Sequence, residues 1–225
     1  PPPHPDREAV VSHDRRLTWR QLEELALRTA GGLKALGVGR GDRVAALLGN
    51  HSDFVVAFLA TQALGAIFVP IGTREQKPGL AYILAHSGAC VLVSDPELQE
   101  RWPEPADTPA LRHRLLAQVP ADRPGAFAAL QSHPALADCE LLEEEAVAVV
   151  MYTSGTTGRP KGAMLSHFNI IHSVLHYREL LRLDEDVRGL VAVPLSHVTG
   201  LVGLMMVSLG LGGTLIIAPT FRASD

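Results

Sequence analysis

Cysteine is scarce in this chain, which has only two among its 225 residues. Cys90 and Cys139 form neither a C-x-x-C pair nor the spacing of a zinc site, so we expect no disulfide framework and no structural metal. Cys90 falls within the apolar run 89–93 and is expected in the core. This usage fits a reducing, cytoplasmic location.

Basic residues are not in excess either. The 20 lysines and arginines against 24 aspartates and glutamates give a formal net charge of -4, and the arginines are scattered along the chain. Nucleic acids are bound by positive charge that is concentrated on one face. We therefore expect no nucleic-acid partner.

A membrane span is not expected. The first residues, 1–14, lack the apolar core of a signal peptide. Residues 198–219 are uncharged throughout and long enough to be considered as a span. The run G-L-G-G at 210–213 divides them into a helix of about a dozen residues and a short strand, which are the lengths of buried elements.

Apolar residues, by contrast, make up 47% of the chain, enough for one large or two small domains. Helical and strand periods alternate along it, with Thr18 and Ser52 as expected helix caps and Gly37 as a stop. This alternation predicts an α/β fold of mostly parallel sheets with flanking helices. The expected helices are 19–36, 53–64, 78–86, 166–183 and 199–209, and the expected strands are 43–48, 66–70, 89–94, 146–150, 163–165, 189–193 and 214–218.

The pattern loosens between residues 95 and 145, where seven prolines interrupt any long element. We expect a surface excursion there, with short helices at 111–118 and 125–131. On this basis the chain divides into a first α/β half at 1–145 and a second part at 146–225.

Residues 151–162 read M-Y-T-S-G-T-T-G-R-P-K-G and follow an expected buried strand. Such hydroxyl and glycine residues do not continue a strand, so their donors are free to face a ligand. Together with one ammonium they suit a polyphosphate. Lys161 is a candidate catalytic residue because Pro160 fixes the backbone before it and Gly162 frees it afterwards. This is not a Walker loop, which requires G-K-[ST].

His197 lies between an expected strand that ends near Pro194 and an expected helix. Ligands of α/β sheets bind at the carboxyl ends of strands, which makes His197 a candidate site residue. On location alone, a helix-capping or buried histidine is the alternative.

The run at 151–162 resembles the signature Y-T-S-G-T-T-G-x-P-K-G of the adenylate-forming superfamily, which includes acyl-CoA synthetases, amino-acid-adenylating domains and luciferases. Further stretches are similar to other motifs of the family, in family order: L-T-W-R-Q-L at 17–22, G-D-R-V at 41–44, A-L-G-A-I-F-V-P-I at 63–71 and P-L-S-H-V-T-G-L at 194–201. Ser196 replaces a frequent aromatic residue, which leaves the shape of the carboxylate pocket open.

The resemblance implies the fold of the large N-terminal domain of acyl-CoA synthetases, here truncated, and an AMP-forming acid-CoA ligase. Its partners would be a small-molecule carboxylate, ATP and CoA, with Mg2+ as the metal. It places His197 beside the acyl carboxylate and gives Thr153 a contact with Mg2+. The implied ATP- and phosphate-binding residues are Thr153, Ser154, Gly155, Thr156, Thr157, Gly158 and Lys161.

Later motifs of the family, Y-G-x-T-E, Y-x-T-G-D and the small C-terminal domain with its lysine, do not occur in the sequence. We therefore expect an N-terminal fragment that binds pyrophosphate weakly and is inactive alone. Two alternatives stay open. One is an amino-acid- or aryl-adenylating domain that feeds a carrier protein, and His197 argues against the amino-acid type. The other is a non-catalytic nucleotide-binding or scaffold module.

Overall fold

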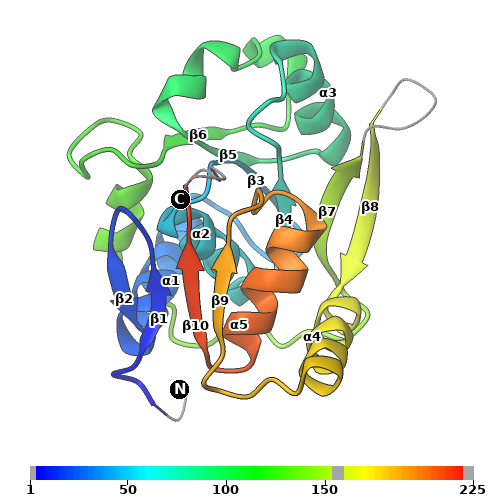
Figure 1. The fold of residues 1–225 in the computed structure, drawn as a ribbon. Helices are drawn as coiled ribbons and strands as arrows, with labels where there is room; N and C mark the ends of the chain where they lie inside the picture. The colour runs from blue at the N-terminus through cyan, green and yellow to red at the C-terminus, as the bar shows by residue number, and fades with distance from the viewer. Residues whose placement is uncertain (1–3, 154–159, 220–225) are drawn as a thin grey trace.

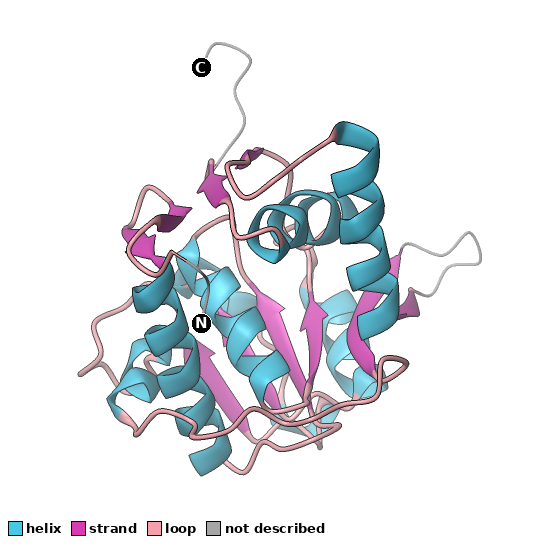
Figure 2. Cartoon of the chain, turned by 90° about the horizontal axis from the view of Figure 1, so that it is seen from below, coloured by secondary structure: helices cyan, strands magenta, loops and turns pink. Residues whose placement is uncertain are grey.

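The computed structural model describes residues 4–153 and 160–219. They form two sheets with helices packed around the strands (Figures 1 and 2), so the predicted mixed α/β class is confirmed. The strands are β1 Glu8–Val11, β2 Arg16–Thr18, β3 Arg43–Leu47, β4 Ile67–Pro70, β5 Val91–Ser94, β6 His113–Leu116, β7 Val147–Thr153, β8 Lys161–Ser166, β9 Arg188–Val191 and β10 Thr214–Ile217. The α-helices are α1 Trp19–Ala35, α2 Ser52–Ala63, α3 Lys77–Ser87, α4 His167–Leu181 and α5 Val207–Gly210.

The larger sheet has the order β6-β5-β3-β4-β7-β8, and the smaller sheet has the order β2-β1-β10-β9. All pairs are parallel except β7 with β8 and β1 with β2, which lie at the sheet edges. The sheets are therefore mostly parallel, as predicted. Parallel strands bring their carboxyl ends to one edge, where α/β proteins bind ligands.

The helix α1 begins as the sequence predicts. The Thr18 hydroxyl accepts a hydrogen bond from the backbone N–H of Gln21, and the Gln21 side chain accepts one from the backbone N–H of Thr18. This capping box satisfies two N–H groups that no helical carbonyl reaches. Gly37, with φ +79°, ends the helix as expected.

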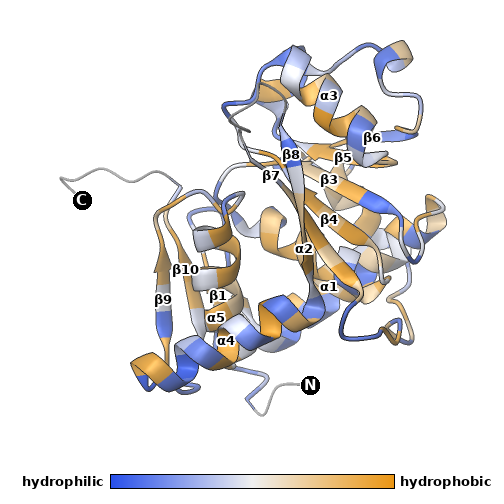
Figure 3. Cartoon of the chain, turned by 90° about the vertical axis from the view of Figure 1, so that its right-hand side faces the viewer, coloured by the Kyte–Doolittle hydropathy of each residue, from blue (hydrophilic) through white to orange (hydrophobic). Residues whose placement is uncertain are grey.

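The centre of the core lies between α2 and the larger sheet. Phe68 of β4 packs edge-on against Phe54 and Phe58 of α2, with ring centroids 5.3 and 5.4 Å apart. All three rings are buried, and the part of α2 that is visible in Figure 3 is coloured as hydrophobic. Cys90 is buried beside this core, as predicted, and both cysteines are free thiols.

The predicted cap at Ser52 is wrong. The residue before α2 is His51, whose side chain makes no capping bond, and Ser52 is already helical. Its hydroxyl donates instead to Asp14, in the turn between β1 and β2, so a tertiary contact has taken the place of a local one.

The predicted helix at 111–118 is also wrong. Residues His113–Leu116 form β6, which pairs in parallel with β5 and extends the larger sheet. Prolines at 109 and 120 limit this segment to a length that suits a strand. Pairing also gives hydrogen-bond partners to the backbone N–H and C=O groups of β5, which would otherwise be unpaired at the edge of the sheet. The second expected helix there is a short 3₁₀ segment, Phe127–Ser132.

The strand before the phosphate motif is longer than predicted. β7 continues through Thr153, and β8 begins at Lys161, so both ends of the motif belong to an antiparallel hairpin. The sequence predicts a loop over all of 151–162, but ladder pairing with β8 keeps residues 151–153 extended. The helix expected at 199–209 is a π-helix, Thr199–Met206, followed by α5.

The sheets do not follow the order of the chain. β7 and β8 join the sheet of β3 to β6, whereas β1 and β2 pair with the sheet of β9 and β10. A division of the chain at residues 145 and 146 remains a prediction. Across residues 4–153 and 160–219, every helix is too short or too polar to cross a bilayer.

Candidate active site

A cleft of about 500 Å³ lies at the carboxyl edge of the larger sheet. Four parts of the chain meet there: the chain after β4, the helix α3, the end of the β7–β8 hairpin and the turn before the π-helix. The lining residues are Pro70, Ile71, Gly72, Arg74, Glu75, Ile83, Met151, Tyr152, Thr153, Pro160, Ser196, His197 and Val198. The cleft thus brings together two of the predicted site residues, Thr153 and His197.

Thr153 and Lys161 lie at the open end of the β7–β8 hairpin, where they are register partners. Both side chains are exposed. Thr153 lines the cleft, whereas Lys161 flanks it next to the lining residue Pro160. The other predicted phosphate-binding residues, Ser154, Gly155, Thr156, Thr157 and Gly158, lie outside the described residues.

His197 is held by a turn that its own backbone helps to form. Its N–H donates to the carbonyl oxygen of Pro194 at 3.1 Å, and its carbonyl oxygen accepts from the N–H of Leu201 at 2.8 Å. Leu195 is buried, whereas the His197 side chain is exposed. The backbone of this turn is therefore anchored in the core while the imidazole is available to a ligand.

Arg74 and Glu75 also line the cleft, although neither is among the candidates predicted from the sequence. The Arg101 guanidinium donates to the carbonyl oxygens of Thr73 at 2.7 Å and Glu75 at 3.2 Å. These bonds fix the backbone on both sides of Arg74. Their position in the sequence is the signal that could have found them. Arg74 and Glu75 closely follow the expected strand 66–70, and the residues after a parallel strand lie at the edge of the sheet where ligands bind.

Tyr152 supports the hairpin from the side of α3. Its hydroxyl lies 2.7 Å from Nδ1 of His86, and the His86 ring stacks on Tyr82. Burial raises the pKa of Tyr152, and the nearby Tyr82 adds to this effect. The phenol therefore remains protonated at neutral pH and holds the strand that ends in Thr153.

A buried hydrogen bond between a histidine and a carboxylate lies beneath the neighbouring strand ends. Nε2 of His51 is 2.8 Å from Oδ1 of Asp95, and both residues are buried. Burial lowers the pKa of His51, but the hydrogen bond to Asp95 and the charges of Asp95, Asp53 and Asp14 outweigh it, so the net shift is upward.

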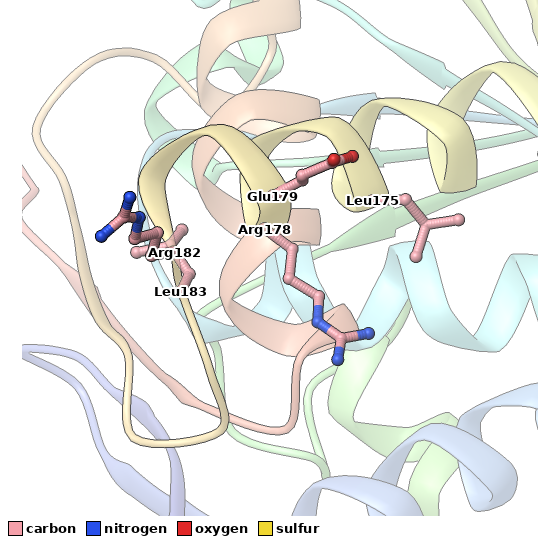
Figure 4. Close-up of a pocket in the computed structure, with 5 residues that line it drawn as sticks. All are labelled: Leu175, Arg178, Glu179, Arg182 and Leu183. Atoms are coloured by element: carbon pink, nitrogen blue, oxygen red, sulfur yellow. The ribbon is translucent and has the colours of Figure 1, made fainter.

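A second hollow, of about 520 Å³, lies at the C-terminal end of α4 (Figure 4). It is lined by Leu175, Arg178, Glu179, Arg182 and Leu183. All five come from one helix end and the residues after it, and the carboxyl end of no described strand contributes. We therefore place the site in the cleft that holds Thr153 and His197.

The sequence profile of one family, described as "AMP-binding enzyme", matches residues 2–225. The chain is 38% identical over 217 residues to a feruloyl-CoA synthase of Amycolatopsis sp, covering 96% of this chain and 42% of that protein. It is 33% identical over 223 residues to a long-chain-fatty-acid–CoA ligase of Mycobacterium tuberculosis, covering 95% of this chain and 42% of that protein. The chain thus spans less than half the length of these relatives.

The fold also matches solved structures. The anthranilate CoA ligase AuaEII in complex with anthranoyl-AMP superimposes with a TM-score of 0.89 at 26% identity, covering 97% of this chain and 43% of that one. ATP-bound MatB from Rhodopseudomonas palustris superimposes with a TM-score of 0.84 at 28% identity, with the same coverage of both chains.

Proposed function

Since the chain belongs to the AMP-binding enzyme family, we propose that its full-length protein is an AMP-forming acid-CoA ligase. One observation carries this proposal: Thr153, at the start of the phosphate motif, lines the same cleft as His197. A triphosphate bound by the motif and a carboxylate beside His197 would lie next to each other in this cleft. The names of the relatives, which are CoA synthases and CoA ligases, support the same reaction class.

The proposed reaction has two steps. A carboxylate oxygen attacks the α-phosphorus of ATP and pyrophosphate leaves, which gives an acyl-adenylate. The thiol of CoA then attacks the acyl carbonyl and loses its proton to solvent, and AMP leaves with the electron pair of the broken C–O bond. In the first step two anions must approach each other, so positive charge and oriented donors provide most of the catalysis.

Lys161 is the proposed source of that charge at the phosphates. The ladder between β7 and β8 fixes its backbone opposite Thr153 and next to Pro160, both of which line the cleft. An ammonium at this position would stabilise the charge that develops on the departing pyrophosphate. The motif residues between them, 154–159, are proposed to supply further phosphate donors.

Mg2+ fits the described donors. Mg2+ in nucleotide sites keeps several waters and binds phosphate oxygens together with one or two protein side chains, usually carboxylates and in P-loop enzymes a Ser or Thr hydroxyl. The exposed Thr153 hydroxyl offers such an oxygen at the strand end. When bound, the ion would screen the phosphate charges.

His197 is proposed to orient the substrate carboxylate. Its exposed ring can donate an N–H hydrogen bond from a backbone that is anchored through buried Leu195. The cleft wall also contains the apolar side chains of Ile71, Ile83 and Val198. We therefore propose a carboxylic acid with an apolar body as the substrate class.

Exchange of labelled pyrophosphate into ATP tests the proposal. We expect the full-length protein to catalyse exchange that depends on a carboxylate from a panel of aryl and alkyl acids. Addition of CoA should then release AMP and the acyl-CoA ester. The 225-residue chain alone is expected to give no hydroxamate-trapped acyl product above blank. Full-length protein that shows neither exchange nor ester formation with any acid would contradict the proposal.

A further inference from the structure

Asn50 ties the two sheets together at their carboxyl edges. Its Nδ2 donates to the carbonyl oxygens of Val193 at 2.9 Å and Ala218 at 3.2 Å, and its Oδ1 accepts from the N–H of Leu195 at 2.9 Å. Asn50 follows β3 of the larger sheet, whereas its partners follow β9 and β10 of the smaller one. A single side chain therefore joins segments at least 143 residues apart in the sequence.

An asparagine is chemically suited to this position. The contact requires two N–H donors and one acceptor on one short side chain, which a primary amide supplies. An aspartate would keep the acceptor but would place a carboxylate oxygen against two carbonyl oxygens. Alanine would leave the Leu195 N–H and both carbonyl oxygens without this partner.

The turn that carries Asn50 is itself fixed from both sides by one carboxylate. Oδ2 of Asp95 accepts from the N–H of Gly49 at 2.8 Å, and Oδ1 is bound to Nε2 of His51 at 2.8 Å. His51 and Asp95 are buried, so this support is shielded from water. The amide of Asn50 is thus presented to the smaller sheet by a rigid turn.

The far end of the bridge lies next to His197. Leu195, whose N–H binds Asn50, precedes His197 by two residues, and the His197 N–H in turn binds the carbonyl oxygen of Pro194. Burial of the Leu195 side chain holds the turn against the core but does not fix the orientation of the turn, because hydrophobic contact is not directional. The hydrogen bonds that Asn50 makes with this segment fix the orientation.

We propose that Asn50 is a positioning residue that holds the His197 turn at the cleft, opposite the Thr153 hairpin. This inference rests on the proposed function, because it assumes that His197 orients the carboxylate. The bridge sets the separation between a phosphate site on the larger sheet and a carboxylate site at the end of the smaller one. Its loss should therefore affect the carboxylate more strongly than ATP.

Asn50→Ala and Asn50→Asp test the proposal in the full-length protein, with Arg7→Ala as the matched control. Arg7 also ties the end of a strand in the smaller sheet, since its Nη2 donates to the carbonyl oxygen of Glu185 at 3.0 Å and to Asp186 at 2.8 Å. That contact precedes β9, at the edge away from the cleft. Arg7→Ala therefore measures the loss of a comparable tie outside the site.

We expect both Asn50 variants to lower kcat/KM for the carboxylate by about 10- to 100-fold, the scale for a displaced reacting group, with KM for ATP changed less than about twofold. Arg7→Ala should leave both constants near wild type. A second readout is the NMR signal of the His197 ring, assigned by its loss in His197→Asn. It should shift and broaden in the Asn50 variants and stay unchanged in Arg7→Ala.

An unchanged His197 signal in a folded Asn50 variant would overturn the proposal, as would equal kinetic losses in the Asn50 and Arg7 variants. If Asn50→Ala does not fold, Asn50→Asp carries the same test. Wild-type protein without carboxylate-dependent exchange would contradict the proposed function, and the NMR comparison would still decide whether Asn50 positions His197.

Discussion

Thr153 and Lys161 face each other across the β7–β8 hairpin, as the last residue of one strand and the first of the next. Antiparallel pairing fixes which residues stand opposite each other, because a slip by one residue would turn each side chain to the other face. The two ends of the phosphate motif are therefore held at a set separation by the sheet. Strand pairing therefore sets the positions of two candidate ligand-binding groups, the hydroxyl of Thr153 and the ammonium of Lys161.

Lys161→Ala should slow adenylate formation in the full-length protein. Removal of one preorganised donor typically costs about 3 kcal/mol of transition-state stabilisation, which corresponds to roughly a hundredfold loss in rate. Carboxylate-dependent exchange of pyrophosphate into ATP measures this step. Lys34→Ala, which removes an exposed lysine from the last turn of α1, is the control and should exchange at the wild-type rate. Equal rates in the two variants would remove Lys161 from the mechanism.

Gly200→Ala should displace the turn that carries His197. A Cβ atom at position 200 would lie 2.3 Å from the carbonyl oxygen of Pro194, so that backbone must move. We expect a loss of about 1–3 kcal/mol in the free energy of unfolding, as for other overpacked sites, together with slower exchange. Gly39→Ala is the control, because nothing lies within 4 Å of a Cβ there. If the two variants had the same stability and exchange rate, the close packing of Gly200 against Pro194 would be unimportant for both stability and activity.

The regular elements were predictable because their signals are local. The apolar runs at β3 and β5 indicate buried parallel strands, and Thr18 as a cap predicts a helix start. Gly37 marks the stop through its left-handed backbone. In these cases a few neighbouring residues determine the structure, so the sequence suffices.

The errors occur where distant residues compete with local preference. β6 is a strand because it pairs with β5, and Ser52 binds Asp14 in a turn that precedes it by 38 residues. Likewise, Lys161 and His197 are sequence candidates whose roles remain predictions. Arg74 follows an expected strand, but only the packing of distant segments brings it to the cleft with Thr153 and His197. Such contacts depend on how the strands are ordered, and strand order is set by the whole chain.

Phe68→Ala should strongly destabilise the protein. The ring is buried between Phe54 and Phe58, so truncation removes buried apolar area and leaves a cavity that the packed helix cannot fill. Such truncations cost about 3–5 kcal/mol. Chemical denaturation, compared at an unchanged m-value, measures the loss. Phe168→Ala on α4, whose residue is 41% exposed, is the matched control and should cost much less. Similar losses would show that the three-ring cluster is not the centre of stability.

The pair of His51 and Asp95 should make stability depend on pH. The pKa of His51 is raised in the folded protein above its ordinary value of 6.5, because burial, which lowers it, is outweighed by the hydrogen bond and charge of Asp95. The folded state therefore binds the proton more tightly than the unfolded state. The contribution to the free energy of unfolding is fully present below pH 6.5 and is lost as the pH rises through the folded pKa.

Urea unfolding of the wild type and of His51→Gln, measured from pH 6.5 upward, tests this expectation. The wild type should lose stability as the pH rises, and the variant should lose less over the same range. Asp95→Asn should weaken the decline in the same way, because without that carboxylate the burial of His51 favours the neutral ring. A wild-type decline that persists unchanged in both variants would assign the titration to another group. The turn that presents Asn50 would then owe its rigidity to hydrogen bonding alone, without the charge on His51.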